Sequence, residues 1–497
     1  MNSSNKHGGL SLFPLSALVV GSIIGSGMFN LPQNMAENSG GAASIVAWLI
    51  TFVGMLCLTL LYQQLALRRP TVFGGPYGYA REGFGDFIGF STAWGRWIAG
   101  ISGNAACLVM LMAAFGGFKV LGFLGNGTTG VAILGGLAVL WVTHMLCLRG
   151  VHSATFVNTI VTLAKIVPIL FFIAVAVAFF QSDVFKQGLW GPGDLGSMAD
   201  KSKGAFRAIF SSGETSRLLF NQVEDAMLYT AWMFVGVESA SLYSARARDM
   251  KTVARATVLG FSLTLVLYMS VSLLSFGLIP QAELATMAAP SMRGIMEVVL
   301  GPTAALIINL GVIISVAGTY LAWTLLAAES LYLTAMGTND TGPKMFGKTN
   351  PKGAPTVALC WTNTVVSLIL IGAYLFGKGY NELILLATAM YLVPYLLSAL
   401  YGVTVAKGDK KGTLDPKFMF VTLLASVYSL WLIYAGGLVF LLLSMILYAP
   451  GIPLFLYRKR EDHLPLVASD REMLCMVVVF VLALWAAYEL LSGAIVL

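Results

Sequence analysis

Hydrophobic residues in this chain gather in long runs that are separated by short polar segments. Each run is close to the ~20 apolar residues that a helix needs to cross a bilayer. The pattern predicts an all-α polytopic membrane protein with twelve to thirteen transmembrane helices. The thirteen runs cover 12–36, 42–66, 86–116, 129–148, 154–181, 222–245, 253–280, 299–336, 355–377, 381–406, 417–436, 437–457 and 472–495.

Two of these runs contain a break in their helical pattern. Residues 21–27 of the first run read GSIIGSG, and residues 236–239 of the sixth run read GVES. Unwound backbone at membrane depth survives only where it is buried in protein or lines a wet cavity. Glycines that only let helices pack closely are the alternative, and the spacing of Gly21 and Gly25 fits it. The second break favours a binding site between two discontinuous spans.

The positions of the two breaks indicate an internal repeat. Runs one and six each begin a set of five runs, and an odd number of spans inverts the second set relative to the first. This organisation predicts a first five-helix repeat over 12–181 and an extracytoplasmic loop over 182–221. The second, inverted repeat follows over 222–406, and additional spans occupy 407–497.

Composition and charge agree with a membrane protein and indicate its orientation. The chain is 57% hydrophobic and 11% charged, whereas soluble domains carry roughly 25% charged residues. Lys and Arg concentrate in segments such as 246–255 and 407–417, which lie inside if the N-terminus is inside. The bias predicts a multi-pass protein of a bacterial inner membrane with a cytoplasmic N-terminus. It also explains the net charge of +7 without a nucleic-acid partner.

The sequence contains no recognisable catalytic or metal site. Its five cysteines fall in or beside the runs at unrelated spacings, so they predict neither a disulfide framework nor metal ligands. No nucleophile–base pair is visible. We therefore predict that the protein is not an enzyme and has no catalytic residue, no metal and no cofactor.

Four motifs resemble the amino acid–polyamine–organocation (APC) superfamily, in its basic amino acid/polyamine antiporter branch. The resemblance covers the ten runs of the two repeats and is greatest to arginine/ornithine and lysine exchangers. It implies the LeuT-like APC fold, with discontinuous spans 1 and 6 and a substrate site between them. The motifs are GSGMF at 25–29 with Leu31-Pro32, GGPYGYAR at 74–81 with Phe84-Gly85, Trp232 with GVESA at 236–240, and AWTLLA at 322–327.

The break in span one offers partners for both charges of an amino acid. Free amides at Ser26 and Gly27 open the helix after the break, where a carboxylate is favoured. Carbonyls before the break, near Ile23, suit the ammonium, as do those around Trp232 and Val235 in span six. The resemblance implies the same assignment.

Further substrate contacts follow from the resemblance alone. Trp232 and Trp323 match tryptophans that sandwich the aliphatic stem of the substrate in relatives, and an indole also attracts a cation. Packing against lipid or core is the alternative for both. Asn104 matches a position that touches the distal end of the substrate.

Charged residues inside the spans are candidates for gating or coupling, because a charge in the membrane is costly. Lys165 matches the place where sodium-coupled relatives hold a sodium ion. It could be a permanently charged strut that ties span five to span one, or it could carry a proton. Both alternatives argue against sodium coupling. Glu238 and Glu329 are predicted to gate or to couple to protons, with structural pairing as the alternative.

Arg96 departs from the family pattern, since relatives often have tyrosine there. If Glu238 or Glu329 neutralises Arg96, the substrate stays cationic. If Arg96 instead faces the pocket, it could pair with an acidic or polar substrate side chain.

These features predict a secondary active antiporter. It would exchange a cationic amino acid of the arginine, lysine or ornithine type for a related amino acid or its amine, by alternating access. Alternatives are an exchanger or permease for neutral or acidic amino acids, and a membrane amino-acid sensor, which would need an appended signalling domain. The predicted partners are small-molecule amino acids and the lipid bilayer. Coupling to protons and a homodimer are both left open.

Overall fold

The structure is a computed structural model that describes most of the chain. Regular structure in the described ranges is helical, apart from one isolated bridge between Thr349 and Pro355. The predicted all-α class is therefore confirmed. The described residues are 11–72, 74–149, 154–191, 213–237, 250–336, 341–408 and 414–492.

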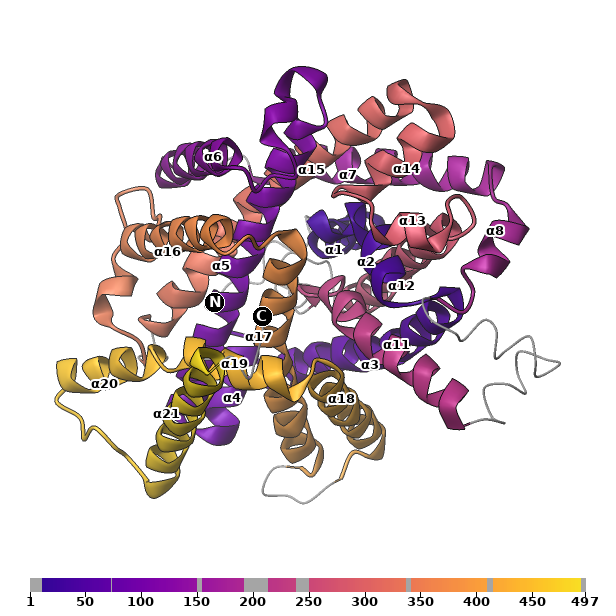
Figure 1. Cartoon of the computed structure of the whole chain (residues 1–497). Coiled ribbons are helices and arrows are strands. Elements are labelled where there is room, and N and C mark those ends of the chain that lie inside the picture. Colours follow the sequence, from indigo (N-terminus) through magenta and orange to yellow (C-terminus); the bar gives the residue numbers. More distant parts are fainter. Residues whose placement is uncertain are drawn as a thin grey trace.

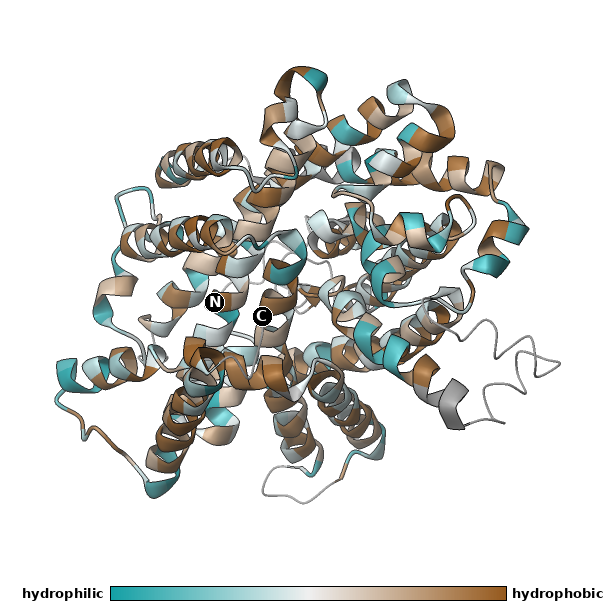
Figure 2. Cartoon of the chain, viewed as in Figure 1, coloured by the Kyte–Doolittle hydropathy of each residue, from teal (hydrophilic) through white to brown (hydrophobic). Residues whose placement is uncertain are grey.

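Ten helices in the described residues are long and apolar enough to cross a membrane. Figure 2 shows hydrophobic residues along these helices and hydrophilic residues gathered in the connections. They match ten of the predicted runs. They are α3 (Gly41–Arg68), α5 (Asp86–Gly116), α6 (Gly130–Leu148), α12 (Met250–Ser275), α15 (Pro302–Thr334), α16 (Thr356–Leu375), α17 (Tyr380–Ala406), α18 (Pro416–Ala435), α19 with α20 (Leu438–Tyr448 and Gly451–Glu461) and α21 (Asp470–Leu491).

The three remaining runs are also helical, but they are interrupted or only partly described. Run one is divided into α1 (Leu12–Ile23), the 3-10 helix η1 (Ser26–Phe29) and α2 (Leu31–Asn38). Run five is α7 (Ala154–Ala178). Run six is α11 (Gly213–Trp232), which begins inside the predicted loop and ends in the middle of the predicted span.

Short helices lie in the connections. Among them, α13 packs against α2, α4 packs against α5 and α17, and α14 packs against α15. The short helices are α4 (Pro76–Phe84), η2 (Lys119–Leu124), α8 (Ser182–Gln187), α13 (Gln281–Ala285), α14 (Ser291–Leu300) and η5 (Lys344–Gly347).

The helix contacts follow a pattern that repeats between the first five runs and the second five. Helix α1 packs on α12 and α11 packs on α3, while α5 packs on α17 and α15 packs on α7. The members of each pair of contacts interchange when runs one to five are matched with runs six to ten. The third helices of the two sets, α5 and α15, pack on each other, and α5 runs through the middle of the bundle in Figure 1.

Glycines allow the helices to approach closely, as small residues commonly do in membrane proteins. A Cβ atom on Gly311 of α15 would lie 2.1 Å from Cγ of Pro168 on α7. A Cβ atom on Gly54 of α3 would lie 2.0 Å from Cγ of Tyr428 on α18. The first of the C-terminal helices, α18, drawn in brown in Figure 1, is thus packed closely on α3 of the first repeat.

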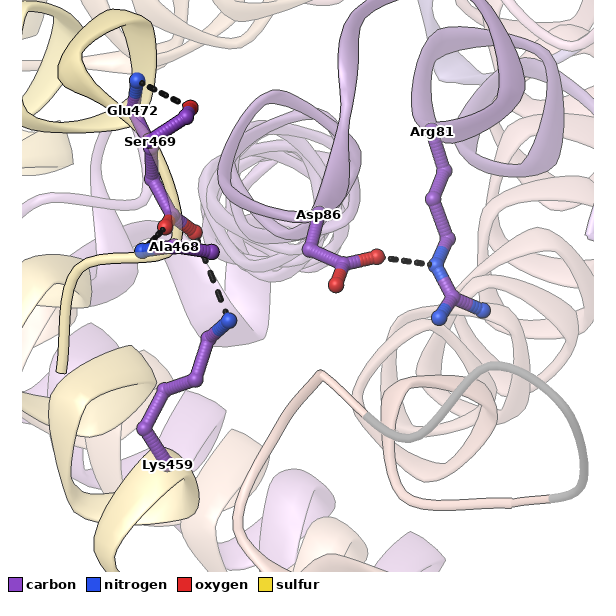
Figure 3. A network of polar contacts seen from close by, with 6 residues as sticks. All are labelled: Arg81, Asp86, Lys459, Ala468, Ser469 and Glu472. Atoms are coloured by element: carbon purple, nitrogen blue, oxygen red, sulfur yellow. Dashed lines mark hydrogen bonds and ion pairs between the residues drawn. The ribbon is translucent and has the colours of Figure 1, made fainter. Parts of the chain in front are cut away.

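Ion pairs join helix ends, as Figure 3 shows. Arg81 of α4 pairs with Asp86 at the start of α5, with 2.7 Å between Nε and Oδ1. Lys459 of α20 pairs with Glu472 of α21 at 3.6 Å, and both side chains are buried. The amide of Glu472 also donates to the side chain of Ser469, which caps α21. These contacts fix the connections while the apolar faces meet the bilayer.

We expect Gly311→Ala to destabilise the protein by about 1–3 kcal/mol, the usual cost of overpacking. The added methyl group would collide with Pro168 and separate α15 from α7. The matched control is Gly372→Ala on α16, where a Cβ atom meets nothing within 4 Å. Thermal unfolding in detergent, followed by size-exclusion chromatography, checks both variants. Equal midpoints for the two would show that the tight contact at Gly311 has no energetic weight.

Candidate functional site

The first helix is interrupted in the middle of the bundle. Helix α1 ends at Ile23, residues 24 and 25 are extended, and η1 begins at Ser26. The last carbonyls of a helix and the first amides of the next one have no partner within their own helix. The break therefore presents both kinds of group to the protein interior.

Two side chains bind the carbonyls at the end of α1. The ammonium of Lys165 donates to the carbonyl oxygens of Gly21 at 3.1 Å and Ile24 at 2.8 Å. The hydroxyl of Tyr268 donates to the carbonyl oxygen of Ile23 at 3.1 Å. Lys165 is only 4% exposed, and Tyr268 is fully buried. The Ile23 carbonyl, predicted to meet the substrate ammonium, thus already has one partner and retains one lone pair.

The amides that follow the break have no such partner. Within the described part of the chain, no backbone carbonyl accepts a hydrogen bond from the amides of Ser26 or Gly27. The Ser26 hydroxyl lies 3.4 Å from the hydroxyl of Tyr380 and 3.5 Å from the thiol of Cys107. Two backbone donors at the start of a helix are therefore available to an anion.

The second break lies directly after Trp232, where α11 ends and the chain continues in turns. Gly236 has φ of 103°, a conformation that glycine adopts without strain. The amide of Val235 donates to the carbonyl of Trp232 at 3.1 Å, which leaves that carbonyl one lone pair. Glu238 lies outside the described residues, so its predicted role stays a prediction.

A cavity lies between the two breaks, where about 370 Å³ is not filled by protein atoms, with the space open to solvent included. Every residue predicted to bind substrate lines it, except Asn104. The lining residues are Ile23, Gly25, Ser26 and Gly27 of span one, Gly103 and Cys107 of α5, Trp232, Met233 and Val235 of span six, Tyr268 of α12, and Thr319 and Trp323 of α15.

Apart from Trp323, sequence reasoning missed the lining residues that come from unbroken helices. Thr319 precedes Trp323 by four residues, so the two lie on one face of α15. That spacing could have identified Thr319 once Trp323 was chosen. Gly103 and Cys107 are likewise four residues apart on α5, on the face for which only Arg96 had been considered.

Asn104 lies beside the cavity rather than in its wall. Its side chain is fully buried, and neither its amide nitrogen nor its amide oxygen has a hydrogen-bond partner in the described residues. It follows Gly103 directly, and Gly100 of the same helix packs on Ala327 of α15. An unpaired buried amide is costly, which makes Asn104 a polar group with unused bonding capacity next to the cavity.

The remaining charged candidates are not in the cavity wall either. Glu329 is exposed, and its position six residues after Trp323 puts it on another face of α15. Arg96 is partly buried and lies seven residues before Gly103. This spacing places Arg96 on the same face of α5, two turns or about 10 Å toward the end where α4 lies.

The two tryptophans of the cavity touch each other. Their ring centroids are 6.2 Å apart, and the rings are tilted by 39°. Carbon atoms in contact are about 3.5–4.0 Å apart, so a methylene chain between two stacked rings needs about 7–8 Å. The predicted sandwich around a substrate therefore requires Trp232 or Trp323 to move from this position.

An amide network connects the helix after the break to its neighbours. The side-chain nitrogen of Asn30, with two hydrogens to donate, lies within hydrogen-bond distance of the side-chain oxygens of Gln33 at 2.9 Å, Asn34 at 2.7 Å and Asn381 at 3.3 Å. Its oxygen accepts from the amide of Ser291 at 3.1 Å. The network ties the α2 end of span one to α17 and α14.

The chain is similar in sequence to known transport proteins. A family model described as amino acid permease matches residues 10–445. An arginine/ornithine antiporter of Pseudomonas aeruginosa is 40% identical over 98% of each chain. A putative arginine/ornithine antiporter of Escherichia coli is 38% identical over 97% of this chain and 99% of that one. An arginine/agmatine antiporter of Chlamydia felis is 34% identical over 98% of each.

A solved structure, a substrate-bound outward-open Na⁺-coupled sialic acid symporter, is also similar to this chain. The two structures match over 88% of this chain and 90% of the symporter chain, with a TM-score of 0.48 and 12% sequence identity.

Removal of the Lys165 ammonium should destabilise the break more than removal of the Tyr268 hydroxyl. Lys165→Met removes two hydrogen bonds to a charged donor, each worth about 1.5–3 kcal/mol, whereas Tyr268→Phe removes one neutral bond worth about 0.5–1.5 kcal/mol. Thermal unfolding of the purified variants in detergent checks the order. A Lys165→Met protein as stable as the unmodified one would mean that the carbonyls of Gly21 and Ile24 do not need the ammonium.

Proposed function

Since this chain belongs to the amino acid permease family, we propose that it exchanges a cationic amino acid of the arginine, lysine or ornithine type for a related amino acid or its amine. Exchange would proceed by alternating access around the cavity between the two broken spans. One observation carries the proposal: the cavity is lined by residues of both breaks and by two indoles. The names of the relatives support the choice of substrate.

The backbone groups of the cavity are proposed to bind the carboxylate and the ammonium that all amino acids share. In the proposal, the amides of Ser26 and Gly27 bind the carboxylate, with the positive end of the helix dipole behind them. The ammonium binds the remaining lone pairs of the carbonyls of Ile23 and Trp232, and the carbonyl of Val235. Both charges of the amino acid are then neutralised without a charged side chain in the cavity wall.

The side chain of the substrate would lie between the indoles and Asn104. A methylene stem packs on Trp232 and Trp323, and an indole face also attracts a guanidinium or ammonium group. The buried oxygen of Asn104, without a partner among the described residues, accepts a hydrogen bond from the distal end. Asn104 is thereby proposed as the residue that distinguishes a long cationic substrate from a short one.

Lys165 is proposed as a permanent strut rather than as a proton carrier. Its ammonium donates to two carbonyls of the break, the kind of oxygen ligand that a sodium ion would otherwise need. The charge that holds span five to span one is then part of the protein. Transport would need no sodium, and the proposal requires neither a proton nor a chemical step.

Arg96 is proposed to act as a gating residue between the cavity and the end of the helix bundle where α4 lies. Glu329 is exposed, which leaves Glu238 as the carboxylate proposed to neutralise Arg96. In this arrangement the substrate stays cationic, because Arg96 does not line the cavity.

The bias of Lys and Arg supports an N-terminus in the cytoplasm of a bacterium and the α2 end of the bundle outside. The proposed organisation is two inverted repeats over 12–181 and 222–406, joined by the extracytoplasmic loop 182–221, with residues 407–497 added to them.

Reconstituted protein should exchange internal arginine or ornithine for external labelled arginine. Proteoliposomes are loaded with unlabelled arginine, lysine, ornithine, agmatine or glutamate, and uptake of labelled arginine is measured. Exchange of glutamate without exchange of arginine, lysine or ornithine would contradict the proposal and favour an acidic substrate.

Gly27→Leu should abolish this uptake, because a side chain there would displace Trp232 and cover the amides that bind the carboxylate. A Cβ atom on Gly27 already lies 2.8 Å from Nε1 of Trp232. The control is Gly122→Leu, at a glycine with no atom within 4 Å of a Cβ atom. Normal uptake by Gly27→Leu would place the carboxylate site elsewhere.

Replacement of sodium by choline on both sides of the membrane should leave the exchange rate unchanged, since Lys165 supplies the cation at the break. The measurement is the initial rate of labelled arginine uptake into loaded proteoliposomes. A strict requirement for sodium would refute the strut assignment.

A further inference from the structure

The indole of Trp232 lies between the backbones of two glycines. A Cβ atom on Gly27 would lie 2.8 Å from Nε1 and 3.0 Å from Cδ1, both in the five-membered ring. A Cβ atom on Gly103 of α5 would lie 3.0 Å from Cη2, at the far edge of the six-membered ring. The two glycines therefore contact opposite ends of one indole, and both line the cavity.

This position of Trp232 occupies space that the substrate needs. Its five-membered ring lies directly over Gly27, whose amide is proposed to bind the carboxylate. Its contact with Trp323, at 6.2 Å between centroids, leaves no room for a methylene stem between the rings. A bound amino acid and the indole in this position therefore exclude each other.

We propose that Gly103 is a positioning residue that sets the affinity for substrate, because its missing side chain lets the indole enter the cavity when no substrate is bound. The inference rests on the proposed function for the identity of the substrate, but not for the position of the indole. Gly103 touches the indole, so it acts on the substrate through Trp232.

The proposal predicts the direction in which the affinity for substrate changes when Gly103 is replaced by alanine. When only a fraction of the protein has an accessible site, the apparent dissociation constant is the intrinsic constant divided by that fraction. A methyl group on Gly103 would come within 3.0 Å of Cη2, and Gly27 at the opposite end leaves the indole no room to slide along its length. We therefore expect the indole to leave its position between the two glycines. The accessible fraction rises, so Gly103→Ala should bind substrate more tightly, whereas an added methyl group in a binding cavity normally weakens binding.

The matched control is Gly25→Ala. This change also adds a methyl group to the cavity, but its Cβ atom meets only Cγ2 of Thr319, at an ordinary 3.8 Å. It does not touch the indole and is not expected to tighten binding.

The first measurement reports on the indole without any substrate. Protein labelled with 5-fluorotryptophan gives a ¹⁹F resonance for Trp232, which is assigned by its loss in Trp232→Phe. Gly103→Ala should shift this resonance in the substrate-free protein, and Gly25→Ala should leave it in place. An unshifted resonance in Gly103→Ala would overturn the inference, whatever the protein transports.

The second measurement is the dissociation constant for arginine by titration calorimetry in detergent. Gly103→Ala should lower it by about three- to tenfold, and the gain should disappear in the Trp232→Phe background. Equal weakening in both backgrounds would mean that Gly103 only makes room for the substrate. If the unmodified protein does not bind arginine, the proposed function fails, and the fluorine shift still tests the position of the indole.

A third measurement covers the case in which Gly103→Ala does not fold. Saturating arginine should move the Trp232 resonance of the unmodified protein, because ligand and indole compete for one space. A resonance that stays in place at saturation would overturn the inference.

Discussion

An interrupted helix inside a membrane leaves backbone carbonyls and amides that hydrocarbon cannot satisfy, and this constraint organises the centre of the molecule. The carbonyls at the end of α1 are bound by Lys165 from α7 and Tyr268 from α12. The amides of Ser26 and Gly27 have no carbonyl partner in the described chain. The protein thus completes the carbonyl side of the break by itself, and we propose that a ligand completes the amide side.

The helices around the break are held in place by contacts that tolerate little change. Tyr428 packs directly on the backbone of Gly54 in α3, and Pro168 packs directly on the backbone of Gly311 in α15. Because this frame is rigid, a small movement of one side chain inside the cavity can change whether a substrate fits. The indole of Trp232 is packed between Gly27 and Gly103. In our proposal it is the group that moves, and its position decides whether a substrate can reach the amides.

The sequence predicts the breaks well, because glycine and serine inside an apolar run are a local signal that needs no knowledge of packing. It predicts poorly which residues of regular helices face the cavity. Gly103 and Thr319 lie on unbroken helices, and their orientation depends on how α5 and α15 pack on each other. The same dependence explains why Asn104 lies beside the wall and why Glu329 is exposed. The contact between the two tryptophans follows from side-chain conformations that no sequence pattern contains.

The division of the break between Lys165 and the substrate is most directly tested by the position of a bound ligand. A cryo-electron microscopy structure of the protein saturated with arginine should show the carboxylate hydrogen-bonded to the amides of Ser26 and Gly27. It should also show Lys165 still donating to the carbonyls of Gly21 and Ile24. Density for arginine away from these amides, or a sodium ion in place of the Lys165 ammonium, would contradict the account.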